Sequence, residues 1–517
     1  MPPPRKSVAE LHDVLSTTRH TQTEMEEDMG DLNITSATQR ELTDEEKSNE
    51  SPPPAATETA AAAPTESSAP ELDISLRIHE KVAAVASKAY RKASAKSNVL
   101  STEKLAGIDL IKFDQIEVGQ LLGKGSFSNV YEITKISSDN ASGEESGDDY
   151  PHKFVTKTKS LGKVTYTQNF LAENYERKYY VEGQSTKTFR YAIKYLKDDI
   201  LSQPNSYAIG TLDLVIEGMF LASLSHPNII KVRALPEGGV DCLMQPKGKG
   251  YFLVLDRLFD TLTDRIYNKW QDEHRVEATG GSGCLCLPFG KKNNTSSAEE
   301  NKYLGERLKV AFDISAALKF LHNKNIIYRD IKPENLGFDV RGDIKLFDLG
   351  LVKELDPQKM KKSGNYKLSM AGTPRYMAPE CGKRKRYNLS ADVYSFSVLL
   401  WEIITMRQPL EDFTYTRLQT EVFENGHRPD IKAITNKNMS ELVRLGWHQD
   451  SSQRPSMDTM YEKLRTEVLM LQGGKLSDTE LSHERRRSTF VPTRFSTVSI
   501  RHLLKTSDHG EIADPDK

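Results

Sequence analysis

The chain has 517 residues, and its 71 Lys and Arg against 73 Asp and Glu give a net charge of −2 at neutral pH. This balance provides no electrostatic footprint for nucleic acid, and the length predicts two to four domains or one large enzyme with tails. Four cysteines (Cys242, Cys284, Cys286 and Cys381) are too few for a disulfide framework, which favours a reducing compartment, the cytoplasm or alternatively the nucleus.

The N-terminal part of the chain is low in apolar residues. Residues 1–73 are rich in Pro, Ser, Thr, Glu and Ala, so they cannot bury enough apolar surface and are expected to be disordered. Residues 74–96 place apolar side chains at helical spacing among several basic ones. A basic amphipathic helix can lie on a membrane or a partner, but we favour a helix docked on the following domain, or none. Residues 1–113 are therefore predicted to be a disordered N-terminal extension with a possible basic amphipathic helix at 74–96.

From residue 114 to about 472 the composition is that of a globular domain. Two loop-like insertions interrupt it, at 136–187 and 272–302, and a flexible C-terminal tail follows at 473–517. No apolar run reaches the ~18–20 residues that a membrane-spanning helix needs, so no transmembrane segment is expected.

The first part of this domain, 114–256, is rich in strand-like patterns such as "FRYAIKYL" and "YFLVLDRL". The second part, 257–472, is dominated by helical patterns such as "ERLKVAFDISAALKFLHNK". A small β lobe followed by a larger helical lobe would place a ligand site between them.

A glycine-rich stretch, Gly123-Lys124-Gly125-Ser126, lies between two strand-like patterns. Glycines allow a backbone turn to approach phosphate groups and to offer its N–H groups to them. The following residues favour a strand, which argues against a Rossmann loop, and the Walker pattern does not occur. An ordinary hairpin turn is the alternative.

Lys194 ends the strand-like "YAIK", and Glu217 lies 23 residues later on a helical pattern. A lysine in this position can reach phosphate oxygens, and a carboxylate paired with it can hold it in place. The alternative for Lys194 alone is a surface lysine on a strand.

Asp330, Lys332, Asn335 and Asp348 follow one another at the ends of short apolar segments. Phosphoryl transfer needs a divalent metal with oxygen ligands, a base that positions the acceptor and a cation near the transferred group. Asn335 and Asp348 can supply Mg²⁺ ligands, Asp330 can accept the hydroxyl proton, and Lys332 can balance charge on the γ-phosphate.

These motifs together resemble the eukaryotic protein kinases. They occur in the order of that family, as "GKGSFSNV", "YAIK", "HPNII", "YRDIKPEN", "DLG", "GTPRYMAPE", "SADVYSFSVLLWE" and "SSQRP". The resemblance implies an α+β, two-lobed kinase fold with ATP and Mg²⁺ as cofactors. It also implies that Arg454 pairs with Glu380 and that Asp392 supports the loop around Asp330. The residues that it places around the nucleotide, beyond those named above, are Val130, Ala192, Leu255, Asp256 and Leu258.

Three positions depart from the family pattern: Ser128 replaces the third glycine, Tyr328 stands where His is usual, and Leu349 replaces Phe. None of them removes a charged catalytic group. The resemblance therefore implies an active enzyme rather than a scaffold that only binds ATP, and "GTPRYMAPE" argues against a small-molecule kinase.

Lys332 with Thr373 resembles the pattern of Ser/Thr kinases, so the expected partners are proteins that present a Ser or Thr hydroxyl. "NGHRPDI" and "LGWHQDSSQRPS" resemble the tyrosine-kinase-like branch, which keeps dual specificity open as the minor alternative.

Phosphorylation is a candidate means of regulation. Arg329, which precedes Asp330, commonly receives a phosphate from the activation loop in this family, and an upstream kinase would supply it. Ser363, Tyr366 and Ser369 are the candidates in that loop, with Thr373 nearby, and a loop ordered without phosphate is the alternative. Ser488, after three arginines in the tail, resembles a target for a basophilic kinase.

Overall fold

The computed structural model describes residues 108–137, 203–239, 250–272 and 297–471, most of 82–100 and 171–200, and Cys242. The residues described up to Val468 belong to one unit, and only 469–471 are described of the second unit, Leu469–Lys517. The predicted C-terminal tail and its Ser488, the region 1–81 and most of both predicted insertions lie outside the described residues. None of the described helices is long and apolar enough to cross a membrane.

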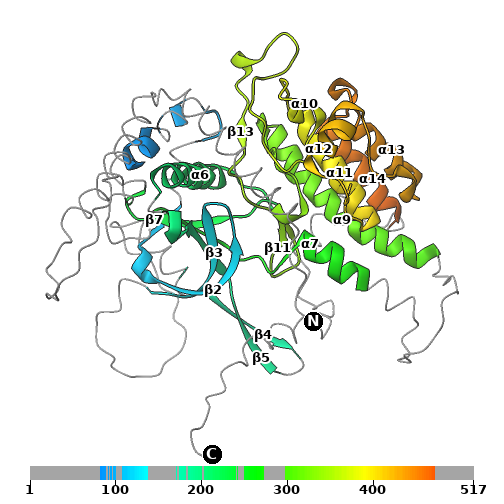
Figure 1. The fold of residues 1–517 in the computed structure, drawn as a ribbon. Coiled ribbons are helices and arrows are strands. Elements are labelled where there is room, and N and C mark those ends of the chain that lie inside the picture. The colour runs from blue at the N-terminus through cyan, green and yellow to red at the C-terminus, as the bar shows by residue number, and fades with distance from the viewer. Residues whose placement is uncertain are drawn as a thin grey trace, which may run out of the picture. The chain divides into compact units, whose positions relative to one another are not determined.

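Six strands form one sheet in the order β1-β7-β8-β6-β3-β2 (Figure 1). Apolar residues of these strands, among them Ile133, Ile193 and Val254, are fully buried in a common core. The central strand β6 pairs with β3 on one side and β8 on the other, which fixes Lys194 opposite Val130 and Leu253. The sheet consists of β1 (Asp109–Ile111), β2 (Ile116–Lys124), β3 (Ser128–Ile136), β6 (Tyr191–Leu196), β7 (Val232–Pro236) and β8 (Phe252–Asp256).

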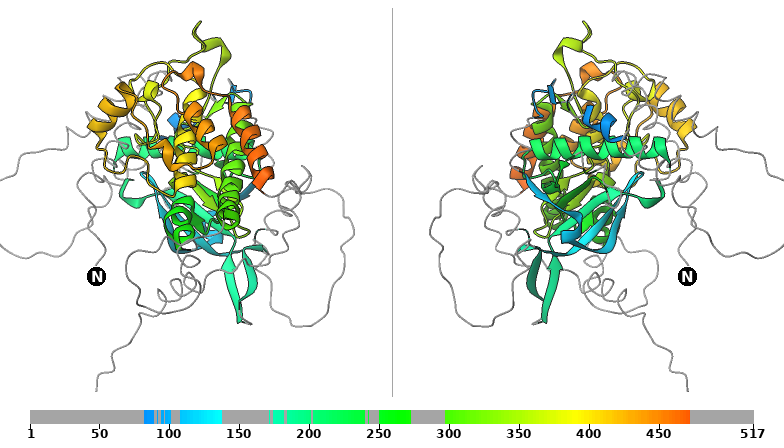
Figure 2. Two further views of the ribbon diagram at one scale, coloured as in Figure 1. Left: turned by 90° about the vertical axis from the view of Figure 1, so that its right-hand side faces the viewer. Right: turned by 90° about the vertical axis from the view of Figure 1, so that its left-hand side faces the viewer.

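Helix α6 (Pro204–Ser223) lies along the sheet, in contact with β6, β7 and β8 (Figures 1 and 2). It begins at a proline, which the first turn of a helix tolerates because its N–H is not needed there. Val215 and Met219 on this helix are fully buried. Glu217 is buried among them, so α6 carries a carboxylate into the interior beneath the sheet.

The second lobe is helical, as predicted. Helix α11 is buried along nearly its whole length and packs against α9 and α13. Gly446 permits the close approach of α13, since a Cβ at this position would lie 1.9 Å from Ser397 Oγ. The main helices are α7 (Leu262–Asp264), α9 (Ser297–His322), α10 (Pro379–Gly382), α11 (Ser390–Thr405), α12 (Tyr415–Arg417), α13 (Lys437–Gly446) and α14 (Met457–Leu471), and the short strands are β9 (Asp260–Thr261), β10 (Ile326–Ile327), β11 (Leu336–Phe338), β12 (Ile344–Leu346) and β13 (Lys353–Glu354).

The α+β architecture of a small β-rich lobe and a larger helical lobe is confirmed, but two features differ from the sequence prediction. Strand β1 pairs with β7 and so begins the sheet before residue 114. An antiparallel hairpin, β4 (Glu176–Val181) and β5 (Gln184–Phe189), lies in a region predicted to be an insertion. Within the possible helix at 74–96, residues 82–88 are helical, and their Val82, Ala83 and Ala86 are buried.

The N-terminal region also contacts a segment far along the chain. The side chain of Ser97 and the backbone N–H of Asn98 both donate to the Glu354 carboxylate, the latter over 2.9 Å. Ser97 Oγ in turn accepts from the N–H groups of Val99 and Leu100. Glu354 is part of β13, which pairs with β10, so this contact links the region before the sheet to the strand that leads to Asp330.

A buried ion pair ties together three parts of the helical lobe. Arg454 donates to both oxygens of Glu380, over 2.6 and 2.8 Å, and its side chain is completely inaccessible to solvent. It also donates to the backbone carbonyls of Ser390 and His448. The pairing expected from the resemblance is therefore present, and it joins α10, the start of α11 and the loop before α14.

We expect Arg454→Met to destabilise the protein strongly, because it leaves the Glu380 carboxylate largely buried without its partner. Loss of one member of a buried pair typically costs about 3–5 kcal/mol. The free energy of unfolding in urea measures the effect. Arg444→Met is the matched control, since Arg444 forms the same kind of two-bond pair with Glu441 on the surface. Equal losses of stability in both variants would contradict the argument.

Candidate active site

The loop that carries Asp330 is held from below by one buried carboxylate. Asp392, at the start of α11, accepts hydrogen bonds from the backbone N–H groups of Tyr328 and Arg329, each 2.8 Å long. The Asp392 carboxylate also lies 2.9 Å from His322 Nε2. Arg329 has a positive φ of 74°, which a non-glycine residue adopts only when its surroundings impose it. Asp392 therefore determines the conformation of the backbone just before Asp330.

Three polar side chains meet at Asp330, which is 7% exposed. Asn335 Nδ2 donates to one carboxylate oxygen of Asp330 and to its backbone carbonyl, both over 2.9 Å. The other oxygen accepts from the backbone N–H and the hydroxyl of Thr373. Lys332 Nζ lies 2.7 Å from the carboxylate and 2.9 Å from Thr373 Oγ1. Burial lowers the pKa of Lys332, but the carboxylates of Asp330, Asp348 and Glu334 together outweigh it and the net pKa is raised, so this lysine is charged.

Gly372 makes the contact between Thr373 and Asp330 possible. Its φ is +102°, and a Cβ at this position would lie 2.3 Å from the carbonyl oxygen of Arg329. Any other residue would force the two loops apart, and the bond from Thr373 to Asp330 would lengthen. The motif Gly372-Thr373-Pro374 indicates this turn in the sequence, but the sequence does not show that Arg329 lies against Gly372.

Lys194 lies where the two lobes approach each other. Its Nζ is 2.6 Å from Glu217 on α6 and 3.5 Å from Asp348, in the loop after β12. Burial opposes the charge on Lys194, but Glu217 and Asp348 raise its pKa well above the ordinary value. The same lysine lowers the pKa of Asp348. One cation thus orients a carboxylate from each lobe.

The glycine-rich stretch forms the turn between β2 and β3, as the hairpin interpretation predicts. The N–H of Gly125 donates to the carbonyl of Ser128 over 2.8 Å and closes the turn. Lys124, Gly125 and Ser126 are exposed there, and Gly123 pairs with Val130 in the ladder. Because β3 also pairs with β6, this turn belongs to the same surface as Lys194.

The residues expected around an adenine ring fall into two groups. Ala192 and Leu255 are paired across β6 and β8 and are buried, while Leu258 lies so close to Gly337 that a Cβ added there would be 2.8 Å from Leu258 Cδ1. Asp256 differs, because both oxygens of its carboxylate accept from Arg233, over 2.7 and 3.0 Å. Its side chain is therefore already engaged.

The candidate regulatory residues have different surroundings. Ser363 is exposed, Ser369 is half-buried, and Tyr366 is buried. The backbone of Tyr366 pairs with Tyr387 in an antiparallel bridge. Arg329, the expected phosphate receptor, donates from Nε to the carbonyl of Leu351 over 2.5 Å.

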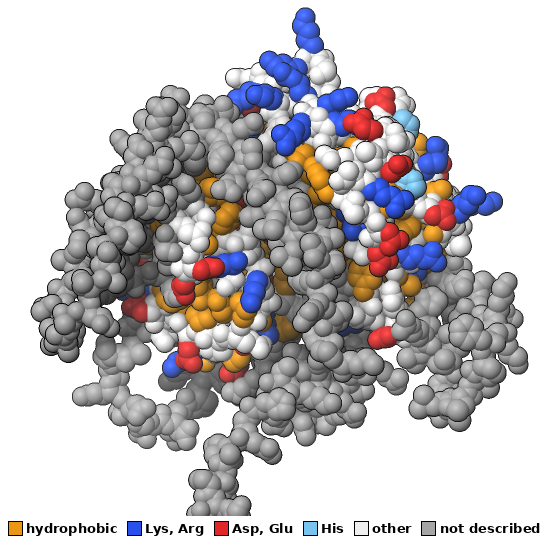
Figure 3. Space-filling model, in the orientation of Figure 1, with side chains coloured by type: hydrophobic (Ala, Val, Ile, Leu, Met, Phe, Trp, Pro, Cys, Tyr) orange, Lys and Arg blue, Asp and Glu red, His pale blue; other side chains and the backbone are white. Residues whose placement is uncertain are grey.

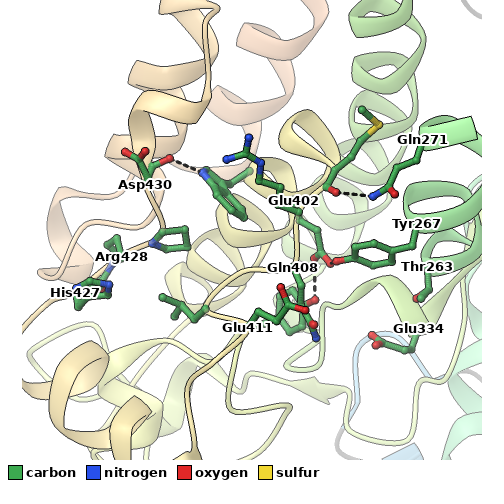
Figure 4. A pocket seen from close by; sticks show the side chains of 16 residues that line it. Thr263, Tyr267, Gln271, Glu334, Glu402, Gln408, Glu411, His427, Arg428 and Asp430 are labelled. Carbon is green, nitrogen blue, oxygen red and sulfur yellow. Dashed lines mark hydrogen bonds between the residues drawn. The ribbon is translucent and has the colours of Figure 1, made fainter. Parts of the chain in front are cut away.

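A pocket of about 770 Å³ lies beside the Asp330 loop (Figure 4). Glu334 lies at its rim and Trp401 on its wall. Buried Glu402 accepts hydrogen bonds from the hydroxyls of Tyr267 and Tyr376, the latter over 2.7 Å. Burial raises the pKa of Glu402 to about 8 despite these bonds. Sequence reasoning missed this carboxylate, since it stands within the apolar run of α11.

Comparison with known proteins gives consistent results. The model of the protein tyrosine and serine/threonine kinase family matches residues 155–464. Serine/threonine-protein kinase STY46 of Arabidopsis thaliana is 36% identical over 157 residues, which are 30% of this chain and 26% of that protein. From the same organism, serine/threonine/tyrosine-protein kinase HT1 is 31% identical over 203 residues, which are 37% of this chain and 50% of that protein. The matched regions thus span half or less of these relatives.

We expect the stability of the protein to depend on pH through Glu402. Its pKa of about 8 in the folded chain lies above the ordinary value of 4.5, so the folded state binds a proton that the unfolded state has lost. Stability therefore falls as the pH rises between about 4.5 and 8, and becomes constant above that range. Urea unfolding from pH 5 to pH 9 should show the wild type losing stability relative to Glu402→Gln. Parallel profiles for the two proteins would be the contrary result.

Proposed function

Since the chain belongs to the protein tyrosine and serine/threonine kinase family, we propose that it transfers the γ-phosphoryl group of ATP to Ser and Thr hydroxyls of protein substrates. One arrangement of residues supports the proposal. Asn335, Lys332 and Thr373 are bonded to Asp330. The neighbouring loop carries Asp348, and the Lys194–Glu217 pair lies next to Asp348. Phosphoryl transfer depends on positioning and on electrostatic stabilisation, and this arrangement offers both.

On the nucleotide side, the turn of Gly123, Lys124, Gly125 and Ser126 would cover the phosphates with its N–H groups. Lys194 would contact the α- and β-phosphates, held in place by Glu217. Val130, Ala192, Leu255 and Leu258 would enclose the adenine ring by apolar contact. Asp256 would contribute through its backbone, because Arg233 engages its carboxylate.

The residues proposed for Mg²⁺ offer oxygen donors of the kind that this ion prefers. Asn335 donates through its amide nitrogen to Asp330, so its carbonyl oxygen is the atom left to face a metal. Asp348 has a lowered pKa and is ionised. When bound, Mg²⁺ would neutralise charge on the phosphates.

On the acceptor side, Asp330 would orient the substrate hydroxyl and accept its proton. Lys332 would balance charge on the transferred group. Thr373 and Lys332 border this position closely, which favours a short hydroxyl side chain. HT1 is named for serine, threonine and tyrosine, so transfer to tyrosine is the minor alternative.

We further propose that phosphorylation in the loop of Ser363, Tyr366 and Ser369 by an upstream kinase raises activity. A phosphate can order such a loop by bonding to Arg329. Ser363 is the accessible candidate, because it is exposed at a turn.

Asp330→Asn should abolish most phosphoryl transfer while leaving ATP bound. A positioned base typically contributes about 10²–10⁴-fold to the rate, and asparagine keeps the size of the side chain and several hydrogen bonds. The measurement is transfer from Mg-ATP to a Ser/Thr protein acceptor, with nucleotide affinity determined separately. Undiminished transfer in this variant would refute the assignment of Asp330, and ATP binding without transfer in the wild type would favour a scaffold or a missing activating phosphate.

Combined replacement of Ser363 and Ser369 by Ala and of Tyr366 by Phe should leave a weakly active enzyme. Phenylalanine preserves the buried ring of Tyr366 and its backbone bridge to Tyr387, so loss of activity would report loss of the hydroxyls. Activity is measured on protein purified from eukaryotic cells, with phosphatase-treated wild type as the control. Unchanged activity in the variant would show that the loop is ordered without phosphate.

A further inference from the structure

The loop after β13 and the segment after α10 present an unusually basic surface. Figure 3 shows Lys and Arg side chains gathered at the top of the view, where Figure 1 shows the loop after β13. Seven basic side chains in these two segments are exposed, and we call them the basic rim: Lys359, Lys361, Lys362, Lys367, Arg384, Lys385 and Arg386.

The fold brings these two segments together although they are separated in sequence. Tyr366 and Tyr387 exchange backbone hydrogen bonds of 2.9 and 3.2 Å. The Asn388 amide then donates to the carbonyl of Gly364 and the side chain of Asn365, over 3.1 and 2.8 Å. The lysines at 361–367 and the run 384–386 therefore lie along one backbone bridge and form a single surface.

Three acidic residues lie in the same stretch, and Glu380 among them is ion-paired with Arg454. Glu354 accepts from Ser97 and Asn98, and Asp356 from the N–H of Gln358; these donors are neutral, so two carboxylates stand against the seven basic side chains of the rim. Even Lys383, next to the rim, is neutralised by Glu424, 2.8 Å away. None of the seven rim residues forms an ion pair within the described part of the chain. The positive charge of the rim is therefore available to bind an acidic partner.

The chain connects the rim closely to the candidate active site. Lys367 precedes Thr373 by six residues, and Thr373 is bonded to Asp330. We expect the flanking residues of a protein segment that presents its hydroxyl at Asp330 to extend over this segment. Fixed charges next to a binding site raise the rate of encounter and discriminate between partners by sign.

Resting on the proposed function, we propose that the basic rim recognises acidic protein substrates, with Asp, Glu or phosphorylated residues flanking the acceptor. A single phosphate on Ser363 carries a charge of about −2 and would leave most of the rim unmatched. The pocket of Figure 4 is lined by both acidic and basic side chains, including Glu411 and Arg407. It is therefore less suited than the rim to select a partner by the sign of its charge.

The test is direct binding of a fluorescent peptide, which does not depend on catalysis. Three peptides share one central Ser and differ only in their flanks, which are acidic, neutral or basic. The full-length wild type should bind the acidic peptide at least about tenfold more tightly than the neutral one in 0.1 M salt, since several charge pairs add. This preference should disappear in 0.5 M salt because of screening.

Two variants divide the surface: Lys361→Gln with Lys362→Gln, and Arg384→Gln with Lys385→Gln and Arg386→Gln. Each should reduce the preference for the acidic peptide and leave binding of the neutral peptide unchanged. Lys432→Gln with Lys463→Gln, at exposed lysines elsewhere, is the matched control. Equal binding of the three peptides by the wild type overturns the inference, as does a preference that survives in both rim variants.

Other anionic partners are tested with the same proteins. Tighter rim-dependent binding of single-stranded RNA, or of vesicles containing phosphatidylserine, than of the acidic peptide would overturn the assignment to protein substrates. Transfer to the neutral peptide is measured in parallel. Acidic-peptide preference with no transfer to any peptide would contradict the proposed activity alone, whereas transfer without preference would contradict only the role of the rim.

Discussion

The hydrogen bonds from Tyr328 and Arg329 to the buried Asp392 carboxylate are the constraint on which the rest of the site depends. They hold Arg329 at a positive φ, a conformation that costs energy for a residue with a Cβ. This conformation turns the chain so that Asp330 faces Asn335 and Thr373. Because Asp392 stands at the start of the most deeply buried helix, α11, the core of the helical lobe determines the position of the proposed base.

A second constraint relates the two lobes through charge. Lys194 comes from the central strand of the sheet, Glu217 from α6 and Asp348 from the loop after β12. The buried Glu217 carboxylate is stable beside this lysine only if the lysine remains charged, and its raised pKa shows that it does. Asp348, by contrast, is exposed. Two carboxylates around one cation leave one net negative charge, which suits a divalent cation such as the Mg²⁺ proposed above.

The sequence predicted those parts of the fold and site whose signal is local. Strand and helix patterns predicted the two lobes, and the spacing of Asp330, Lys332, Asn335 and Asp348 predicted one shared chemistry without coordinates. The contact from Ser97 to Glu354 joins positions 257 residues apart, and neither residue is distinctive in its local sequence. Strand β1 was missed because it has only three residues, and the β4–β5 hairpin because its residues are largely polar; pairing with other strands, rather than propensity, decides their structure.

Glu402 and the basic rim show two ways in which tertiary structure changes the effect of a charged side chain. In α11, burial raises the pKa of Glu402 to about 8 although two tyrosine hydroxyls donate to it, so this carboxyl group is largely protonated at neutral pH. Around the loop after β13, the fold pairs Glu380 with Arg454 and leaves the lysines exposed, so basic side chains outnumber the unpaired carboxylates on this surface. Net charge, at −2 for the whole chain, records neither effect. The fold pairs some charged side chains with one another, and a substrate encounters the charged side chains that remain unpaired. The proposed function of this surface therefore depends on which charges the fold has paired.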